Sequence, residues 1–170
     1  ELLLGGIRME AMATQAGGRT NGMIVKIKSA AFQGVGALPI EVEVDGSHGL
    51  ASLQIVGLPD KAVNEAKERV RTAIENSGYD FPVQRITINL APADIRKEGP
   101  SFDLPIAVGI LSVSHQIDPD LASRYAVVGE LALDGRVRAV SGILPMVFEL
   151  KRRRFKGIIV PEGNAAEAGV

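Results

Sequence analysis

The apolar run 104–111 (Leu-Pro-Ile-Ala-Val-Gly-Ile-Leu), which follows a glycine–proline turn and a serine, constrains the fold of this chain most. Gly99-Pro100 marks a loop, Ser101 is a residue type that favours helix N-caps, and the run is long enough for a buried helix. Pro105 is compatible with a helix because the N–H groups of the first turn have no intrahelical partner. The pattern predicts a helix over 102–114, with Ser101 either capping it or performing chemistry.

The composition supports one domain with a core around such a helix. The chain has 170 residues, is 46% hydrophobic and contains no tryptophan. A core made of Ile, Val, Leu and Ala suits strands layered with helices, so we expect an α/β or α+β domain. The net charge of −1 means that any nucleic-acid contact would need a local basic patch.

Several kinds of site are excluded or disfavoured by residue usage. The chain has no cysteine, which excludes disulfides, thiolate metal sites and a cysteine nucleophile. The histidines His48 and His115 lie far apart in the sequence, so we predict no metal site. No apolar run reaches the roughly 18 residues of a membrane span, and we therefore expect a cytoplasmic protein without a membrane partner.

The two ends of the chain differ from its centre. Residues 1–22 have no sustained period, whereas a regular pattern begins at Met23. We interpret 1–22 as a leader or upstream extension outside the fold and 23–170 as the domain, the alternative being a docked N-terminal arm. Residues 162–170 begin a helix that the chain does not complete, which predicts truncation before a further domain.

Alternating apolar and polar residues predict most of the strands. Three strands with glycine-bearing turns between them indicate an antiparallel meander, over 23–31, 40–45 and 51–56. A further strand over 85–91 directs Ile86, Ile88 and Leu90 inward and ends at Pro92, so it leads into the loop before Ser101.

The clearest helix is predicted over 61–77. Asp60 is its N-cap, Gly78 fits the left-handed position after its end, and apolar residues recur at spacings of three and four. That buried face consists of Val63, Ala66, Val70, Ala73 and Ile74. The other positions, Arg69 among them, carry charges of both signs and indicate a solvated surface rather than a nucleic-acid interface.

The last third of the domain is predicted to form a hairpin, a helix and a strand. Asp134-Gly135 between 125–133 and 136–140 is a strong hairpin signal. Ser141 is expected to cap a helix over 144–153, and 157–161 to form a short strand.

Three segments in the same order resemble the N-terminal domain of the ComM/YifB family, which comprises magnesium-chelatase-like AAA+ ATPases. They are Gly-Leu-Pro-Asp at 57–60, Gly-Pro-Ser-Phe-Asp-Leu-Pro at 99–105 and Gly-Glu-Leu-Ala-Leu-Asp-Gly-Arg-Val at 129–137. The resemblance covers 23–170. It implies an α+β, Lon-protease-like fold with a mixed sheet and helices packed on it, related to a ribosomal small-subunit protein and to the C-terminal domain of the recombination protein RadA.

The same resemblance assigns a role to Ser101 and then puts that role in doubt. Lys97-Glu98-Gly99-Pro100-Ser101 is similar to the Lon motif that carries the nucleophilic serine, so Ser101 falls on that serine. The general-base lysine of Lon proteases falls on Leu144, which can accept no proton. The resemblance therefore implies a pseudo-protease without catalytic residues, in which Ser101 contributes about 1 kcal/mol as a helix cap.

A serine peptidase that uses Ser101 with a non-standard base is the alternative. Lys97 or Lys151 would have to act as that base, although the sequence places neither beside the serine. A partner module unrelated to DNA also stays open.

The resemblance further implies what this chain lacks. Family members continue into an ATPase domain with a phosphate-binding loop Gly-x-x-x-x-Gly-Lys-Ser/Thr, which this sequence does not contain. We therefore expect no cofactor here, with ATP and Mg bound only by the missing ATPase domain. The expected partners are that AAA+ domain and neighbouring protomers of a hexameric ring, which in full-length relatives drives branch migration of DNA in competence.

A basic cluster is the candidate DNA contact, formed by Lys151, Arg152, Arg153, Arg154 and Lys156. The alternative is that these cations complement the dipole at a helix C-terminus and stay solvated.

We predict that alanine at three of these cations in the full-length protein weakens DNA binding and flattens its dependence on salt, because fewer counterions are then released. Binding titrations over a range of salt concentrations measure this. An unchanged salt dependence would contradict a direct contact.

Overall fold

The computed structural model describes residues 3–4, 7–8, 23–153 and 155–169. Most of the predicted leader 1–22 lies outside the described residues. Within it, the short strands β1 (Leu3–Leu4) and β2 (Ile7–Arg8) pair with each other in antiparallel fashion.

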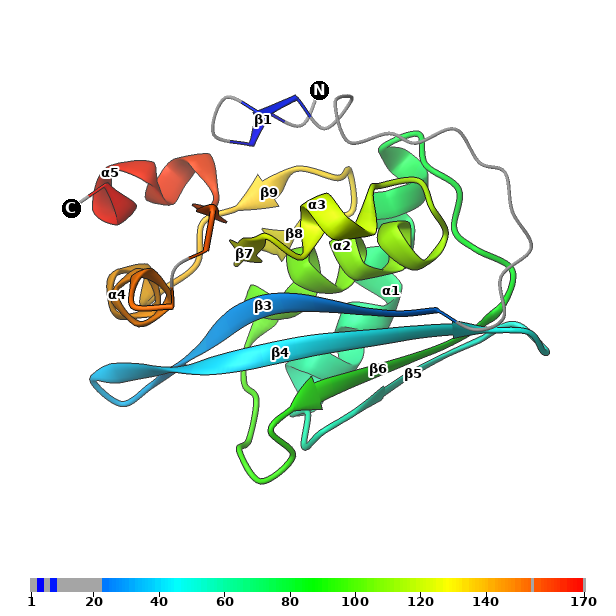
Figure 1. Cartoon of the computed structure of the whole chain (residues 1–170), viewed down its shortest axis with the longest axis horizontal. Helices are drawn as coiled ribbons and strands as arrows, with labels where there is room; N and C mark the ends of the chain where they lie inside the picture. Colours follow the sequence, from blue (N-terminus) through cyan, green and yellow to red (C-terminus); the bar gives the residue numbers. More distant parts are fainter. Residues whose placement is uncertain (1–2, 5–6, 9–22, 154, 170) are drawn as a thin grey trace.

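The domain is built on a mixed six-stranded sheet (Figure 1). Its strand order is β10-β7-β3-β4-β6-β5. The strands are β3 (Met23–Gln33), β4 (Gly36–Ser47), β5 (Ser52–Val56), β6 (Arg85–Ala91), β7 (Tyr125–Val127) and β10 (Gly157–Ile159). The β3–β4 and β4–β6 pairs are antiparallel, whereas β5–β6, β3–β7 and β7–β10 are parallel. This mixed sheet with helices packed on it confirms the predicted α+β class.

The predicted meander of three strands is wrong at its third strand. β5 pairs with β6 in parallel, and β6 separates it from β4. The reason is the helix α1 (Lys61–Asn76), which follows β5 and returns the chain to the starting end of the sheet. Two strands joined through such a crossover run parallel, and a hairpin turn cannot connect them.

Helix α1 itself confirms the prediction made for 61–77. The Asp60 carboxylate accepts a hydrogen bond of 2.7 Å from the Val63 N–H, as an N-cap does. Gly78 has a φ of 82°, in the left-handed region expected after the helix end. The buried residues of α1 are those that the apolar spacing indicated, namely Val63, Ala66, Val70, Ala73 and Ile74.

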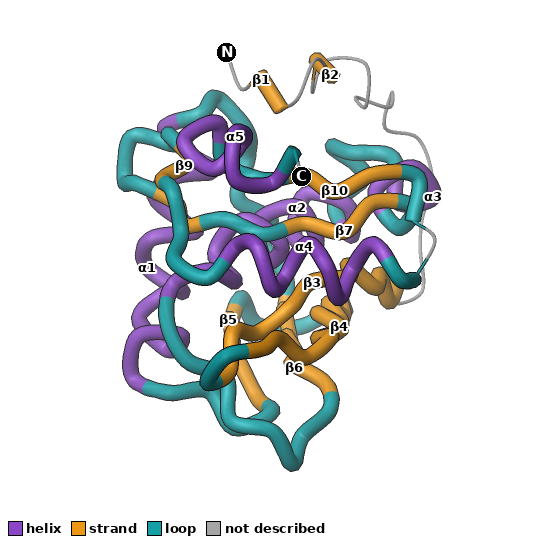
Figure 2. Tube along the Cα trace, turned by 90° about the vertical axis from the view of Figure 1, so that its left-hand side faces the viewer, coloured by secondary structure: helices purple, strands orange, loops and turns teal. Residues whose placement is uncertain are grey.

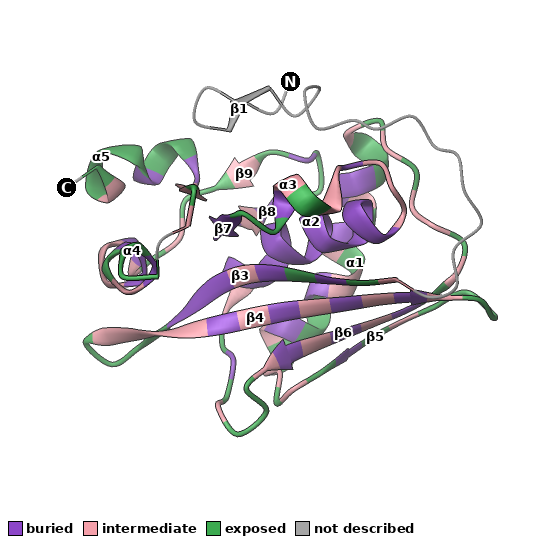
Figure 3. Cartoon of the chain, viewed as in Figure 1, coloured by how far each residue is buried: buried purple, intermediate pink, exposed green. Residues whose placement is uncertain are grey.

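The two faces of the sheet carry separate cores (Figure 3). Helices α1 and α2 (Asp103–Val113) share the larger core with one face, to which Ala31 of β3 belongs. The neighbouring residue Ala30 belongs to the smaller core of α4 (Ile143–Lys151), because successive strand residues point to opposite faces. Helix α4 therefore packs on part of the opposite face, against β3 and β4. In Figure 2 it crosses the front of the view near β3.

Every residue of α2 is buried, which confirms the helix expected from the run 104–111. It is preceded by the 3-10 turn η2 (Pro100–Phe102). The sheet lies on one side of α2, and α1 packs against another. The apolar run forms a helix that packs against β3, β4 and α1.

The predicted hairpin at Asp134-Gly135 is confirmed in a shorter form. The segment 125–133 is divided between β7 in the main sheet and β8 (Glu130–Leu131), which pairs with β9 (Val137–Arg138). The prediction of one continuous strand over 125–133 is therefore wrong.

The predicted cap at Ser141 is wrong, since α4 begins after Gly142, which has a φ of 73°. A Cβ at residue 142 would lie 2.5 Å from Phe32 Cγ, so only glycine fits this helix start.

Shorter helical segments complete the chain: α3 (Pro119–Ala122), η3 (Glu162–Asn164) and α5 (Ala165–Ala168). The last two agree with the helix start expected at 162. In the part of the chain that the structure describes, no helix combines the length and the apolarity needed to cross a membrane.

Gly57, between β5 and α1, provides a test of this packing. Its φ is 97°, and an added Cβ would lie 2.3 Å from the carbonyl oxygen of Leu90 in β6. We predict that Gly57→Ala lowers the free energy of unfolding by about 3 kcal/mol, from left-handed strain and a displaced backbone. Urea denaturation followed by circular dichroism measures the loss.

Gly78→Ala is the matched control, because Gly78 has a similar φ of 82° but no atom lies within 4 Å of an added Cβ. It should cost about 1 kcal/mol, from left-handed strain alone. Equal losses in the two variants would show that the contact with Leu90 does not matter.

Candidate functional site

Ser101 lies at the junction of β7 and α2. It is the central residue of η2 and is only 6% exposed. Its carbonyl oxygen accepts a hydrogen bond of 3.0 Å from the Gly129 N–H, and the Gly129 carbonyl accepts one of 3.0 Å from the Leu104 N–H. These bonds hold the serine turn against the end of β7.

The predicted role of Ser101 as a helix cap is wrong. The N-cap of α2 is Phe102, and no side chain caps that end. The 3-10 turn starts earlier, at Gly99 with a φ of 80°, and has proline in its first turn. Ser101 therefore lies inside a turn instead of at its boundary, where a cap must be.

Lys97, a candidate base, is completely buried. Its Nζ donates a hydrogen bond to the carbonyl oxygen of Pro92, at the start of the same loop. Burial lowers the pKa of Lys97, which the charge of Asp94 partly offsets. A lowered pKa suits a general base, but among the described residues no hydrogen bond joins this amine to Ser101.

The backbone of Lys97 also fixes the loop to the start of α1. Its N–H donates to the Leu58 carbonyl at 3.1 Å, and its carbonyl accepts from the Asp60 N–H at 3.0 Å. The Asp60 carboxylate, already the cap of α1, accepts a further bond of 3.3 Å from the Gly99 N–H. Lys97 thus acts as an internal brace of the loop 92–99.

Asp103, two residues after Ser101, is a completely buried carboxylate. Arg69 of α1 donates to both of its oxygens, from Nε at 2.8 Å and from Nη2 at 3.0 Å. The Leu131 N–H of β8 adds a third bond of 3.2 Å. One carboxylate therefore connects α1, α2 and β8.

The pKa values of this ion pair show the competing effects. Burial raises the pKa of Asp103, although the bonds from Arg69 and Leu131 oppose that rise. The bond to Asp103 raises the pKa of Arg69. Our sequence-based interpretation of Arg69 as a solvated charge is wrong, because its guanidinium turns toward a carboxylate that is distant in sequence.

Leu144, at the position of the lost lysine, lies half-buried in the first turn of α4. The preceding residue, Ile143, belongs to the same buried cluster as Val128, which directly precedes Gly129. Gly129 is the residue that holds Ser101. The fold therefore brings both positions of the protease-like pattern to the same end of β7.

Lys151, the other candidate base, lies at the opposite end of α4. At 1.5 Å per residue, it is roughly 10 Å along the helix axis from Leu144. Lys97 is bonded to Pro92, and Lys151 lies at the end of α4 away from Leu144. Catalysis with either lysine as the base stays an untested alternative.

The predicted basic cluster follows the end of α4. Arg153 donates to Glu149 from Nε at 3.1 Å and Nη2 at 3.0 Å, and Arg152 lies 3.8 Å from the same carboxylate. Lys156 lies over the Tyr125 ring, 5.6 Å from its centroid. Arg154 is outside the described residues, and direct DNA contact by the cluster stays a prediction.

Lys28 of β3 extends this cluster, which the sequence did not indicate. Burial lowers the pKa of Lys28, and the nearby charges of Lys26 and Arg153 lower it further. Lys28 and Lys26 are paired across the strands with Glu41 and Glu43. In the sequence, the spacing of Lys26 and Lys28 indicated only that they share one face of a strand. That Arg153 lies near them depends on how α4 packs on the sheet.

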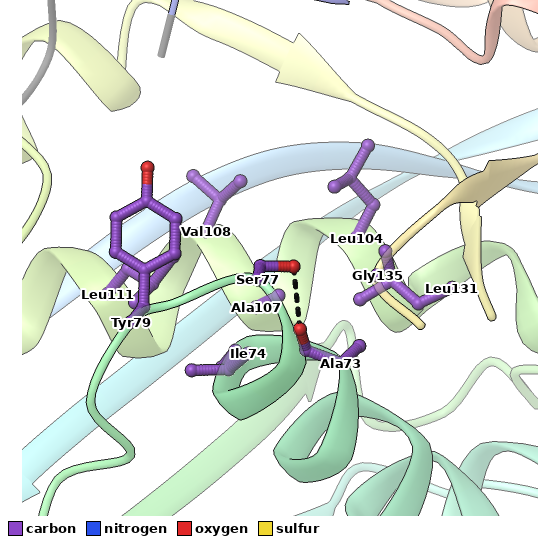
Figure 4. Close-up of a pocket in the computed structure, with 10 residues that line it drawn as sticks. All are labelled: Ala73, Ile74, Ser77, Tyr79, Leu104, Ala107, Val108, Leu111, Leu131 and Gly135. Carbon is purple, nitrogen blue, oxygen red and sulfur yellow. Dashed lines mark hydrogen bonds between the residues drawn. The ribbon is translucent and has the colours of Figure 1, made fainter. Parts of the chain in front are cut away.

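Two further features bear on ligand binding. A cleft between α1, α2 and the β8–β9 turn, drawn in Figure 4, has a volume of only about 30 Å³ and holds little more than a water molecule. In the described ranges no group of three or more His, Asp or Glu side chains is arranged to hold a metal ion.

Comparison with known proteins gives consistent results. A family model described as "Subunit ChlI of Mg-chelatase" matches residues 42–164. The protein YifB of Salmonella typhimurium is 50% identical over 144 residues, which cover 85% of this chain and 28% of that relative. The competence protein ComM of Haemophilus influenzae is 43% identical over 144 residues, with the same coverage.

Lon protease 2 of Bacillus subtilis is more distant, at 29% identity over 141 residues, which cover 75% of this chain and 25% of that protease. This similarity agrees with a Lon-like fold. The chain spans less than a third of the length of these relatives.

The buried pair of Arg69 and Asp103 predicts a pH-dependent loss of stability. Arg69→Met removes an effect that lowers the pKa of Asp103, so that pKa rises further above its value in the unfolded chain. The folded state then binds more protons, and stability falls as pH rises through this range. We expect a loss of about 2 kcal/mol or more near pH 8 and a smaller loss near pH 5, measured by urea denaturation.

The double variant Arg69→Met/Asp103→Asn is the control, since it has no carboxyl group to titrate at this position. Its stability relative to the unsubstituted protein should change less between the two pH values. A single-variant loss that is equal near pH 5 and near pH 8 would contradict the role assigned to Asp103.

Proposed function

The chain belongs to the family of subunit ChlI of Mg-chelatase and, within it, to the ComM/YifB proteins, and on this premise we propose that it is a non-catalytic Lon-like module. Its task is to support the assembly of a longer AAA+ ATPase. The chain's share of its relatives, 28% of their length, leaves ample room for such an ATPase domain.

The observation that carries this proposal is the surroundings of Ser101. A serine hydroxyl becomes a nucleophile only when a base within hydrogen-bond reach takes its proton. The resemblance to Lon proteases places the base at Leu144, and the amine of the buried Lys97 is bonded to the carbonyl of Pro92. Among the described residues, no base is hydrogen-bonded to the serine hydroxyl, which supports a role without acyl transfer.

The bonds around the serine support an architectural role instead. The Gly129 bond to Ser101 and the three bonds to Asp103 connect η2, α1, α2 and β8 at one point. A domain held in this way is a rigid body that can position a neighbouring domain without chemistry of its own.

For the whole protein we propose a ring-forming ATPase that acts on DNA. The H. influenzae relative is named a competence protein, which supports natural transformation as the process. Branch migration of DNA is the activity that the family resemblance implies. ATP and Mg belong to the ATPase domain. The partners of this chain would then be that domain and the neighbouring protomers of a hexameric ring.

A serine-reactive fluorophosphonate tests the proposal against the serine-peptidase alternative. We predict no adduct mass on Ser101 after incubation of the folded domain, because no base activates the hydroxyl. Intact-protein mass spectrometry measures the adduct, with a known serine hydrolase as the positive control.

An adduct that disappears in the Ser101→Ala variant would overturn the non-catalytic assignment. In that case Lys97→Met would identify the base, since labelling would decrease if the Lys97 amine takes the proton.

A further inference from the structure

Strand β10 is an edge of the six-stranded sheet, next to β7 (Figure 2). An apolar hollow lies beside this strand. The hollow has a volume of about 300 Å³ and lies between β10, α4 and α5. Its apolar walls are formed by Val147, Leu150, Phe155, Ile158, Val160 and Ala168. Four of these residues, from Phe155 onward, are only partly buried. Apolar surface therefore remains accessible beside a strand that pairs with β7 on one side and, in the described part of the chain, has no strand partner on the other.

A second hollow continues the first. It has a volume of about 500 Å³ and shares Leu150 and Phe155 with the hollow beside β10. Its other walls include Pro39 of β4, Pro92 after β6, and the charged residues Lys28 and Arg153. The two hollows therefore lie side by side along the C-terminal half of α4, separated by Leu150 and Phe155, and together we call them the groove.

The backbone of β10 has a hydrogen-bonding side turned away from the sheet. The Ile159 carbonyl accepts a bond of 3.0 Å from the Val128 N–H, so Ile159 faces its neighbour on the β7 side. In a parallel strand, the N–H and C=O of one residue point to the same side, and those of the next residue point to the other side. The N–H and C=O of Ile158 therefore point to the outer edge, while its side chain lines the hollow.

The charges around the groove are mainly positive. Lys151 lines the hollow beside β10, and Lys156 directly precedes that strand. Arg153 and Lys28 line the second hollow, where Arg153 is paired with Glu149 and Lys28 with Glu41, so the positive rim is the part beside β10. A ligand that matches this rim carries negative charge beside apolar groups.

We propose that this groove binds an extended peptide segment that pairs with β10 as an added strand, with apolar side chains in the hollow and acidic side chains near Lys151 and Lys156. Strand addition uses the backbone groups of Ile158, and alternate side-chain pockets supply specificity. DNA phosphates would contact the cations, but they would contact neither the apolar walls nor the outer edge of β10.

The binding test uses a fluorescein-labelled octapeptide, read by fluorescence anisotropy, whose odd positions carry glutamate, leucine, leucine and glutamate and whose even positions carry serine. The leucines and glutamates then share the face of the added strand that meets the hollow and Lys151. Two control peptides replace the glutamates by lysine or the leucines by serine, and each should bind at least about tenfold more weakly. In an ¹⁵N–¹H spectrum of the domain, the leucine–glutamate peptide should shift the amide signals of 157–159.

Ile158→Pro and Ile158→Ala separate strand pairing from side-chain burial. Both shorten the side chain, but only proline removes the outward N–H, and an edge strand tolerates proline there. We predict that Ile158→Pro weakens peptide binding about fivefold more than Ile158→Ala does, through one lost backbone bond. Circular dichroism shows whether each variant is folded.

Charge reversal tests the rim without touching the core. Lys156→Glu should weaken binding of the leucine–glutamate peptide about fivefold at low salt. Lys61→Glu, on a 92% exposed side chain of α1, changes the net charge equally and should leave binding unchanged.

Three outcomes of the binding tests would overturn this proposal. They are equal binding by the Ile158→Pro and Ile158→Ala variants, equal binding of the glutamate and lysine peptides, and a DNA duplex that binds through Lys156 while the peptide does not bind. Dimerisation that Ile158→Pro abolishes would also overturn it, by assigning the edge to a second copy. The outcome is independent of fluorophosphonate labelling at Ser101, so the two proposals can fail separately.

Discussion

The buried carboxylate of Asp103 is the group on which the arrangement of this domain most depends. An isolated charge in a protein interior costs several kcal/mol, so it is tolerated only with nearly complete hydrogen bonding. Arg69 supplies two bonds and the Leu131 amide a third, each from a different element. The pair therefore stabilises one relative position of α1, α2 and β8, because any other position would leave a buried charge without partners.

The serine loop is held by a second buried charge of the same kind. Lys97 is enclosed completely and donates to Pro92, while its backbone pairs with the segment before α1. These bonds keep a loop of protease-like shape even though leucine stands where the Lon pattern has its base. The buried polar groups maintain the loop, and under the proposed non-catalytic role the shape of this loop is separable from catalysis.

Helix α4 has consequences on the opposite face of the sheet. It buries Ala30, Ala126 and Val128 in a core of its own, and its end brings Arg153 close to Lys28. Because α4 covers only part of that face, a groove remains between its C-terminal half and the edge strand β10. The same packing places Leu144 at the end of β7, so the position of the lost base and the groove lie at opposite ends of one helix.

The sequence by itself determined the elements that depend on near neighbours. The limits of α1, the strand β6, the turn at Asp134-Gly135 and the buried nature of α2 follow from caps, periodicity and turn residues, and the three motifs identified the family. Tertiary structure alone decided the rest, including the partner of β5, the Arg69–Asp103 pair and the outward edge at Ile158. The capping role expected of Ser101 failed because Gly99 and Pro100 begin a turn one step earlier. Such features depend on contacts between residues distant in sequence, which no local pattern records.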